Sequence, residues 1–322
     1  MKQTKKLTAL IVLLLIMAST GTLQGQSKEL QKLRVIVFRV DAATVVARSQ
    51  GLFAAEGLEV TTIPTPNSTE QMRGLGQGKY DIASTAFDNV LAWSGREDAE
   101  IVAVAQISDK TVLPVFVRPE IKTWSDLKGK KLAADAVDTA FALVLRRVLL
   151  ANGLDLNRGD YELVAVGATG QRLESMIKGE TFAAILNTPF DVKALSAGMR
   201  RIGDSREVLP DYPNTIFAVN RDWGQKNRNT LVAFLRAWLK AGNWVKDPAN
   251  REAAVRLVGG ELKLNPKQAT GSVEELSNTG NLNLPGLETV LSLRTQFGFK
   301  LNKGDKLAAY YDTAYINAAK GK

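Results

Sequence analysis

Short apolar runs rich in β-branched residues alternate with helical periodicity through the first two thirds of this chain. Residues 34–38 (RVIVF) predict a buried parallel strand, because the run is short, apolar and bounded by polar residues. Further strands are predicted at residues 58–63, 81–84, 101–105, 132–134, 163–166 and 183–186. Helices are predicted between them at residues 42–50, 68–75, 88–94, 139–151 and 171–178. This alternation predicts βαβ units, an α/β fold class and mostly parallel sheets.

The strand–helix pattern runs twice and is then replaced by helices. A polar turn at residues 124–131 opens the second run. The apolar segments 112–117 (VLPVFV) and 215–219 (TIFAV) flank that run, and we interpret them as two linkers that cross between lobes. In the C-terminal third, apolar residues recur at three- and four-residue spacing and predict one buried helix face. They are Leu231, Phe234, Leu235, Trp238, Gly242 and Val245.

The amino-terminal segment indicates export. Three lysines precede an apolar stretch at residues 7–18, and small and polar residues follow up to residue 26. This order is typical of a secretory signal peptide, predicted here as residues 1–26. The apolar stretch is shorter than the roughly 20 residues that span a bilayer, although an uncleaved anchor is the alternative. Since the chain has no cysteine to carry a lipid, we expect a soluble periplasmic protein.

The residue inventory removes several kinds of chemistry. The absence of cysteine excludes disulfides, thiolate catalysis and cysteine-ligated metals. The absence of histidine removes the commonest general base and transition-metal ligand. No acidic loop has the spacing of a calcium site, so we expect neither a metal nor a cofactor. The net charge of +9 falls to +6 without the three lysines of the signal, and its dispersal argues against a nucleic-acid partner.

Five short pieces carry a resemblance to a known family. They are residues 47–60 (ARSQGLFAAEGLEV), 78–83 (GKYDIA), 126–131 (DLKGKK), 177–180 (IKGE) and 217–222 (FAVNRD). Each alone is explained by a turn before a strand, but their order and spacing together are specific. The chain resembles the periplasmic binding proteins for sulfonates, taurine, nitrate and thiamine-pyrimidine precursors, the NMT1/THI5-like family.

The resemblance implies a two-lobed periplasmic binding protein fold of type II, with the second lobe inserted in the first. Lobe one would comprise residues 27–113 and 214–322, and lobe two residues 114–213. The implied function is the substrate-binding protein of an ABC importer, which closes on a small organic ligand (a sulfonate, a carboxylate or a pyrimidine-like compound). The implied partner is a permease in the inner membrane, contacted transiently by a monomer.

Ligands of open α/β sheets bind beyond the carboxyl ends of the strands, and this rule selects the candidate site. The candidates are Arg39, Asp41, Ala42, Asn67, Ser68, Thr85, Phe87, Asp88, Asp138, Thr139, Ala140, Asn187, Thr188 and Phe190. Family members commonly place a hydroxyl residue at the loop after the third strand and at the first long helix of lobe two. Thr85 and Thr139 occupy those positions.

Most of these candidates have a structural alternative. Thr139 or Asp138 would serve equally well as a helix cap, and Ser68 is the expected N-cap of the helix that Gly76 ends. Phe87 and Phe190 would equally suit the hydrophobic core.

The charged candidates are ambiguous. Arg39 directly after an apolar strand can pair bidentately with a carboxylate or sulfonate, or form an ion pair with Asp41 or Asp88. Asp41 and Asp88 are also candidates for capping or solvation. Asp41, Asp88 and Asp138 together would repel a small bare anion. Either some of them point away, or the ligand has a cationic or hydrogen-bond-donating part.

Three other functions compete with import. Synthases related to the thiamine-pyrimidine branch need a histidine and a cysteine-rich motif, which this chain lacks. A hydrolase that uses only carboxylates remains as an alternative, although no spacing favours it. A partner that presents its ligand to a membrane sensor would have the same fold and cleft. We therefore expect a binding protein without catalytic residues.

The signal-peptide interpretation predicts where the mature chain begins. Cleavage is expected between about Thr22 and Ser27, where small residues follow the apolar stretch. Amino-terminal sequencing of protein from a periplasmic extract checks this. Recovery of only the full-length chain, in washed membranes, would contradict it.

Overall fold

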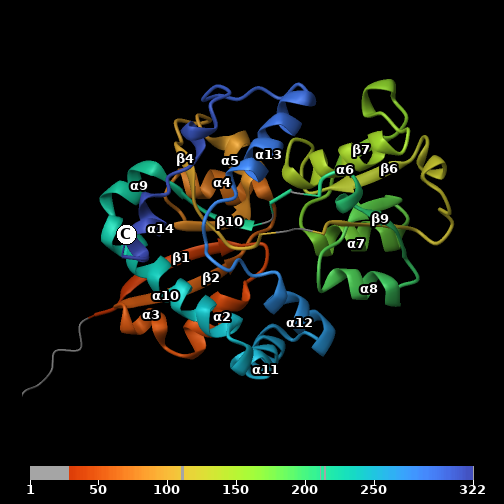
Figure 1. The fold of residues 1–322 in the computed structure, drawn as a ribbon. Coiled ribbons are helices and arrows are strands. Elements are labelled where there is room, and N and C mark those ends of the chain that lie inside the picture. Colours follow the sequence, from red (N-terminus) through yellow and green to blue (C-terminus); the bar gives the residue numbers. More distant parts are fainter. Residues whose placement is uncertain (1–28, 110–111, 211, 214, 322) are drawn as a thin grey trace, which may run out of the picture. The chain divides into compact units, whose positions relative to one another are not determined.

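Two five-stranded sheets, each flanked by helices, organise the described part of the chain (Figure 1). The computed structural model describes residues 29–109, 112–210, 212–213 and 215–321. The predicted signal peptide and its cleavage region up to residue 28 lie outside them. Residues 31–322 form one compact unit, so contacts between the two sheets are contacts within that unit.

The first sheet has the order β2-β1-β3-β10-β4. β1 (Gln31–Val37) pairs in parallel with β2 (Leu58–Pro64) and with β3 (Ile82–Ala86). β10 (Thr215–Asn220) is antiparallel to both β3 and β4 (Ile101–Gln106). Four strands therefore run in one direction, as the βαβ pattern predicts, and one strand from far along the chain runs against them.

The second sheet repeats this design with the order β7-β6-β8-β5-β9. β6 (Lys131–Ala134) pairs in parallel with β7 (Glu162–Ala165) and with β8 (Ala183–Ile185). β5 (Pro114–Val117) is antiparallel to β8 and to β9 (Arg200–Asp204). The reversed strand again occupies the fourth position.

The interpretation of residues 112–117 and 215–219 as linkers is wrong for most of their length. They form β5 and β10, the antiparallel strands within the sheets. Val115, Val117, Ile216 and Val219 are all buried, as expected of an inner strand covered on both faces. The chain crosses from one sheet to the other just before each of these strands.

The five helices predicted between strands lie close to their predicted positions, and further helices accompany them. Together they are α2 (Ala42–Ser49), α3 (Leu52–Ala55), α4 (Ser68–Gly76), α5 (Phe87–Trp93), α6 (Ala140–Ala151), α7 (Thr169–Lys178), α8 (Phe190–Ser196), α9 (Arg221–Lys226), α10 (Arg228–Lys246), α11 (Arg251–Leu262), α12 (Pro266–Glu274), α13 (Leu284–Gln296) and α14 (Ala314–Ala319). Asn67, and not Ser68, is the N-cap of α4, because the Asn67 side chain accepts a hydrogen bond from the Glu70 backbone N–H. None of the described helices is both long and apolar enough to cross a membrane.

The predicted buried face of α10 is confirmed, and it packs on the first sheet. Phe234 stacks on Phe53 of α3 with a ring separation of 5.3 Å, and its edge meets Phe217 of β10 at 5.1 Å. Trp238 meets the same Phe217 at 5.4 Å. These aromatic contacts attach α10 both to α3, near the start of the described chain, and to β10.

Truncation of this aromatic cluster should destabilise the protein strongly. Phe234→Ala removes a fully buried ring with two aromatic partners, and the free energy of unfolding should fall by about 3–5 kcal/mol. Urea denaturation followed by tryptophan fluorescence measures the loss. Asn243→Ala, at an exposed position of the same helix, is the control. A loss below about 1 kcal/mol for Phe234→Ala would contradict this packing.

Candidate ligand-binding site

A cavity of about 510 Å³ lies between segments that belong to the two sheets. On the side of the first sheet, the cavity is lined by residues that follow β1 and β3. On the side of the second sheet, it is lined by the start of α6 and the segment after β8. Residues 271–276, at the end of α12, complete the wall. The cavity therefore lies at the carboxyl ends of the parallel strands, where the loops leave room for a ligand.

The structure places six of the predicted site residues in this wall and leaves the others outside it. Those in the wall are Arg39, Asp41, Thr85, Ala140, Asn187 and Thr188. Those outside its lining are Ala42, Asn67, Ser68, Phe87, Asp88, Asp138, Thr139 and Phe190. Ala42 and Phe87 are buried core residues, Asn67 caps α4, and Phe190 packs against a small apolar cluster of the second sheet.

Asp41 faces the cavity and also begins a helix. It is the N-cap of α2, and its carboxylate accepts from the Thr44 backbone N–H at 3.0 Å and from Thr44 Oγ1 at 2.6 Å. Trp238 Nε1 donates a third hydrogen bond at 2.9 Å. All three donors are neutral, so these bonds hold the carboxylate in place without cancelling its charge.

Arg39 has a partner that neither sequence alternative anticipated. Its guanidinium forms an ion pair with Glu275, and Nη1 donates to Ser272 Oγ at 3.4 Å. Burial lowers the pKa of Arg39, and the carboxylates of Asp41 and Asp191 oppose that shift. Neither Asp41 nor Asp88 is its ion-pair partner in the described structure. Because Glu275 lies in the C-terminal third, sequence spacing could not reveal the pair.

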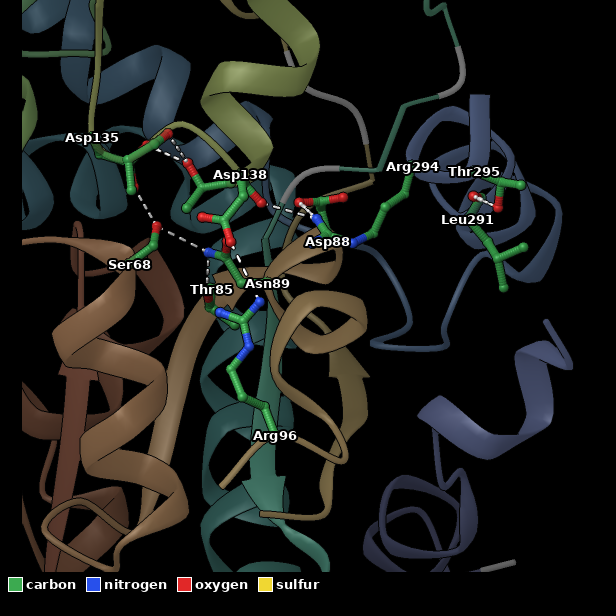
Figure 2. A network of polar contacts seen from close by, with 12 residues as sticks. Ser68, Thr85, Asp88, Asn89, Arg96, Asp135, Asp138, Leu291, Arg294 and Thr295 are labelled. Carbon is green, nitrogen blue, oxygen red and sulfur yellow. Dashed lines mark hydrogen bonds and ion pairs between the residues drawn. The ribbon is translucent and has the colours of Figure 1, made fainter. Parts of the chain in front are cut away.

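A buried polar network lies between the two sheets (Figure 2). Ser68, at the start of α4, donates to the Asp135 carboxylate, which follows β6. The single Thr139 hydroxyl proton is shared between two acceptors, the other Asp135 oxygen at 2.6 Å from Oγ1 and the Ala136 carbonyl at 3.0 Å. Asn89 of α5 donates to Ser68 Oγ at 3.2 Å and to Thr85 Oγ1 at 2.9 Å. Thr139 therefore precedes α6 without capping it through its side chain, and its hydroxyl bonds the Asp135 carboxylate that Ser68 reaches from the first sheet.

A second bridge between the sheets runs through Arg294 of α13 (Figure 2). Arg294 Nη1 lies 3.0 Å from Asp88 Oδ2 and donates to the Asp138 carbonyl at 2.9 Å. Asp88 and Arg294 are each only 1% exposed. Burial raises the pKa of Asp88 to about 6, although Arg294 opposes the shift. The Asp138 carboxylate meets Arg96 at 3.4 Å, so two of the three acids expected in the cleft are engaged outside the cavity lining.

Several wall residues escaped the sequence analysis, and aromatic rings are prominent among them. Phe38, directly after β1, meets Phe141 of α6 edge to face at 5.8 Å, across the two sheets. The buried guanidinium of Arg172 lies 4.6 Å from the Phe141 ring. Tyr212 also lines the cavity. Phe38 and Phe141 each adjoin a candidate that the sequence did select, but Phe38 was assigned to the predicted strand 34–38, which ends one residue earlier in the structure.

The acids Asp191 and Glu275 were also missed. Asp191 lies one residue beyond Phe190, in the first turn of α8. Its carboxylate accepts from Thr188 Oγ1 at 3.1 Å and from the Val192 backbone N–H at 2.8 Å. Within the described ranges, no group of three or more acidic side chains is placed to hold a metal ion.

Comparison with known proteins agrees with this architecture. The chain is 24% identical over 253 residues to a formylaminopyrimidine-binding protein of Halalkalibacterium halodurans, covering 74% of each chain. The alkanesulfonate-binding protein SsuA of Xanthomonas axonopodis, solved with MOPS, superposes with a TM-score of 0.71 at 17% identity, covering 89% of this chain and 99% of that one. The nitrate-binding protein NrtA of Synechocystis superposes with a TM-score of 0.74 at 14% identity, covering 91% and 89%.

These likenesses confirm the predicted fold, and all three relatives are named as binding proteins. A family model covers most of the chain, from residue 27 to residue 259, and includes both sheets and the cavity wall except residues 271–276. The chain belongs to the NMT1-like family.

Proposed function

We propose that this chain is the substrate-binding protein of an ABC importer and that it captures a small organic ligand between its two sheets. The observation that carries the proposal is the cavity at the carboxyl ends of strands from both sheets. Its volume of about 510 Å³ lies within the range of pockets that hold small molecules. The relatives that bind a pyrimidine, a sulfonate and nitrate support the same role.

The proposed organisation follows the crossing points of the chain. Residues 1–26 act as a signal peptide that directs a soluble protein to the periplasm. Residues 27–113 and 214–322 form lobe one, and residues 114–213 form lobe two. The protein acts as a monomer that docks transiently on an inner-membrane permease, and it has no catalytic residues.

The proposed motion is hinge closure of the two lobes on the ligand. The expected hinge comprises residues 112–117 and 214–219, which largely coincide with β5 and β10, so we propose that bending occurs where the chain enters these strands. The network around Asp135 then forms on closure, since its partners Ser68 and Thr139 come from opposite lobes and all three are buried. Opening would return the Asp135 carboxylate to water.

A ligand carried through purification is the direct test of capture. Native mass spectrometry of freshly purified protein should show the chain plus a small organic molecule, which is lost on denaturation. The exact mass of the released molecule then gives its composition. The proposal fails if the freshly purified protein carries no such molecule and binds none from a periplasmic extract.

Removal of the two hydroxyl donors to Asp135 should shift the protein towards an open form. In Ser68→Ala/Thr139→Ala the buried carboxylate loses both partners, and each unsatisfied contact costs about 1–3 kcal/mol. The closed form should then lose at least tenfold in relative population. X-ray scattering should report a larger radius of gyration for the variant.

Ser196→Ala removes an exposed hydroxyl that bonds only within α8, so it is the matched control. Its radius of gyration should equal that of the wild type. An unchanged radius in Ser68→Ala/Thr139→Ala, with unchanged hydrogen exchange in the crossing segments, would argue for a rigid cleft.

A further inference from the structure

The described wall of the cavity carries an excess of negative charge. Four carboxylates (Asp41, Asp191, Glu274, Glu275) face two guanidiniums (Arg39, Arg201). Both guanidiniums already have acidic partners, since Arg39 pairs with Glu275 and Arg201 with Asp204. Glu274 pairs with Arg251.

Asp41 and Asp191 remain as the two wall carboxylates without an ion pair among the described residues. Their hydrogen bonds come from hydroxyls, backbone N–H groups and an indole, all of them neutral. Both carboxylates line the same cavity as Arg39 and oppose the lowering of its pKa by burial. One comes from the segment after β1 and the other from α8, so closure brings two negative charges together around one neutralised arginine.

An unsatisfied hydrogen-bond acceptor also favours a ligand that donates hydrogen bonds. Asn89 lines the cavity and is 1% exposed, and its Oδ1 has no hydrogen-bond partner within the described residues. Its orientation follows from its neighbour: the Ser68 hydroxyl proton goes to Asp135, so Ser68 Oγ can only accept, and the Asn89 amide N–H must face it. The side-chain oxygen of Asn89 is therefore left without a hydrogen-bond donor among the described residues. The buried Tyr212 hydroxyl, in the same wall, also has no partner among the described residues, but it can donate as well as accept and so favours neither kind of ligand group.

Both observations call for a ligand that donates hydrogen bonds and carries positive charge. A buried acceptor without a donor is unfavourable, and so are two uncompensated carboxylates, whereas an ammonium or amidinium group would satisfy both. The rings of Phe38, Phe141 and Tyr212 favour a flat or apolar body beside that group, and an aromatic face also attracts a cation.

We propose that the cavity selects a small organic cation in which an amine or amidine group, set between Asp41 and Asp191, is attached to an aromatic or heterocyclic body. This inference rests on the proposed function and narrows its ligand class. It departs from the sulfonate and nitrate named for two of the structural relatives. A bare anion would meet two unpaired carboxylates and an arginine already engaged by Glu275.

Three probes that share one body separate the charge classes. Benzylamine is a cation at pH 7, benzyl alcohol is neutral and phenylmethanesulfonate is an anion. The full chain, stripped of bound molecules by unfolding and refolding, is titrated with each probe and followed by ligand-observed NMR. The benzylammonium ion should bind at least tenfold more tightly than phenylmethanesulfonate.

Asp191→Asn should weaken benzylammonium binding about tenfold and leave benzyl alcohol within twofold, because the shape is kept and one charge is lost. Glu162→Gln, an exposed carboxylate on β7, is the control and should change neither affinity. Tightest binding of phenylmethanesulfonate, or equal binding of all three probes, overturns the cationic ligand class while the binding function stands. Binding of none of the three also overturns the inference, and native mass spectrometry of the freshly purified protein then decides separately whether it captures a small molecule.

Discussion

A buried carboxylate connects the two sheets beside the cavity. Asp135 follows β6 of the second sheet and accepts hydrogen bonds from Thr139, just ahead of α6, and from Ser68, at the start of α4. A charge removed from water is unfavourable unless hydrogen bonds replace its hydration. Thr139 lies in the same half as Asp135, but the Ser68 hydroxyl reaches the carboxylate only while the two halves are close together. Because the cavity wall takes residues from both halves, its shape depends on how close the halves are.

The two sheets share one topological feature. In each, one antiparallel strand comes from the segment where the chain crosses between halves: β5 in the second sheet and β10 in the first. Each crossing is thus anchored in a hydrophobic core directly after it leaves the other half. The proposed hinge closure would therefore involve bending where the chain enters β5 and β10.

Local patterns predicted much of the fold, and long-range contacts escaped prediction. The parallel strands were found because their β-branched runs have a recognisable length and setting, and α10 because its apolar residues repeat at helical spacing. Residues 112–117 were interpreted as a linker because an apolar run that contains a proline suits a linker and an inner strand equally well. β9 was missed because Arg200 and Arg201 give it a polar start at the edge of its sheet.

Prediction of the candidate site was likewise limited by long-range contacts. The rule that ligands bind beyond strand ends selected Thr85, Asn187 and Thr188, all of which reach the cavity wall. It could not distinguish residues that face the cavity from those that join the sheets, because Ser68 and Thr139 occupy equivalent positions in the sequence pattern. Side-chain direction decides between these roles, and it depends on partners such as Asp135 and Glu275 that spacing does not identify.

Closure of the two halves around a ligand is the central claim, and a distance across the cavity tests it most directly. The chain has no cysteine, so spin labels at Lys193→Cys on α8 and Lys267→Cys on α12 report one distance between the halves. Electron–electron double resonance on protein with its small molecule retained should give a single short distance. Protein stripped of that molecule should add a longer one. The same single distance in both samples would contradict the account.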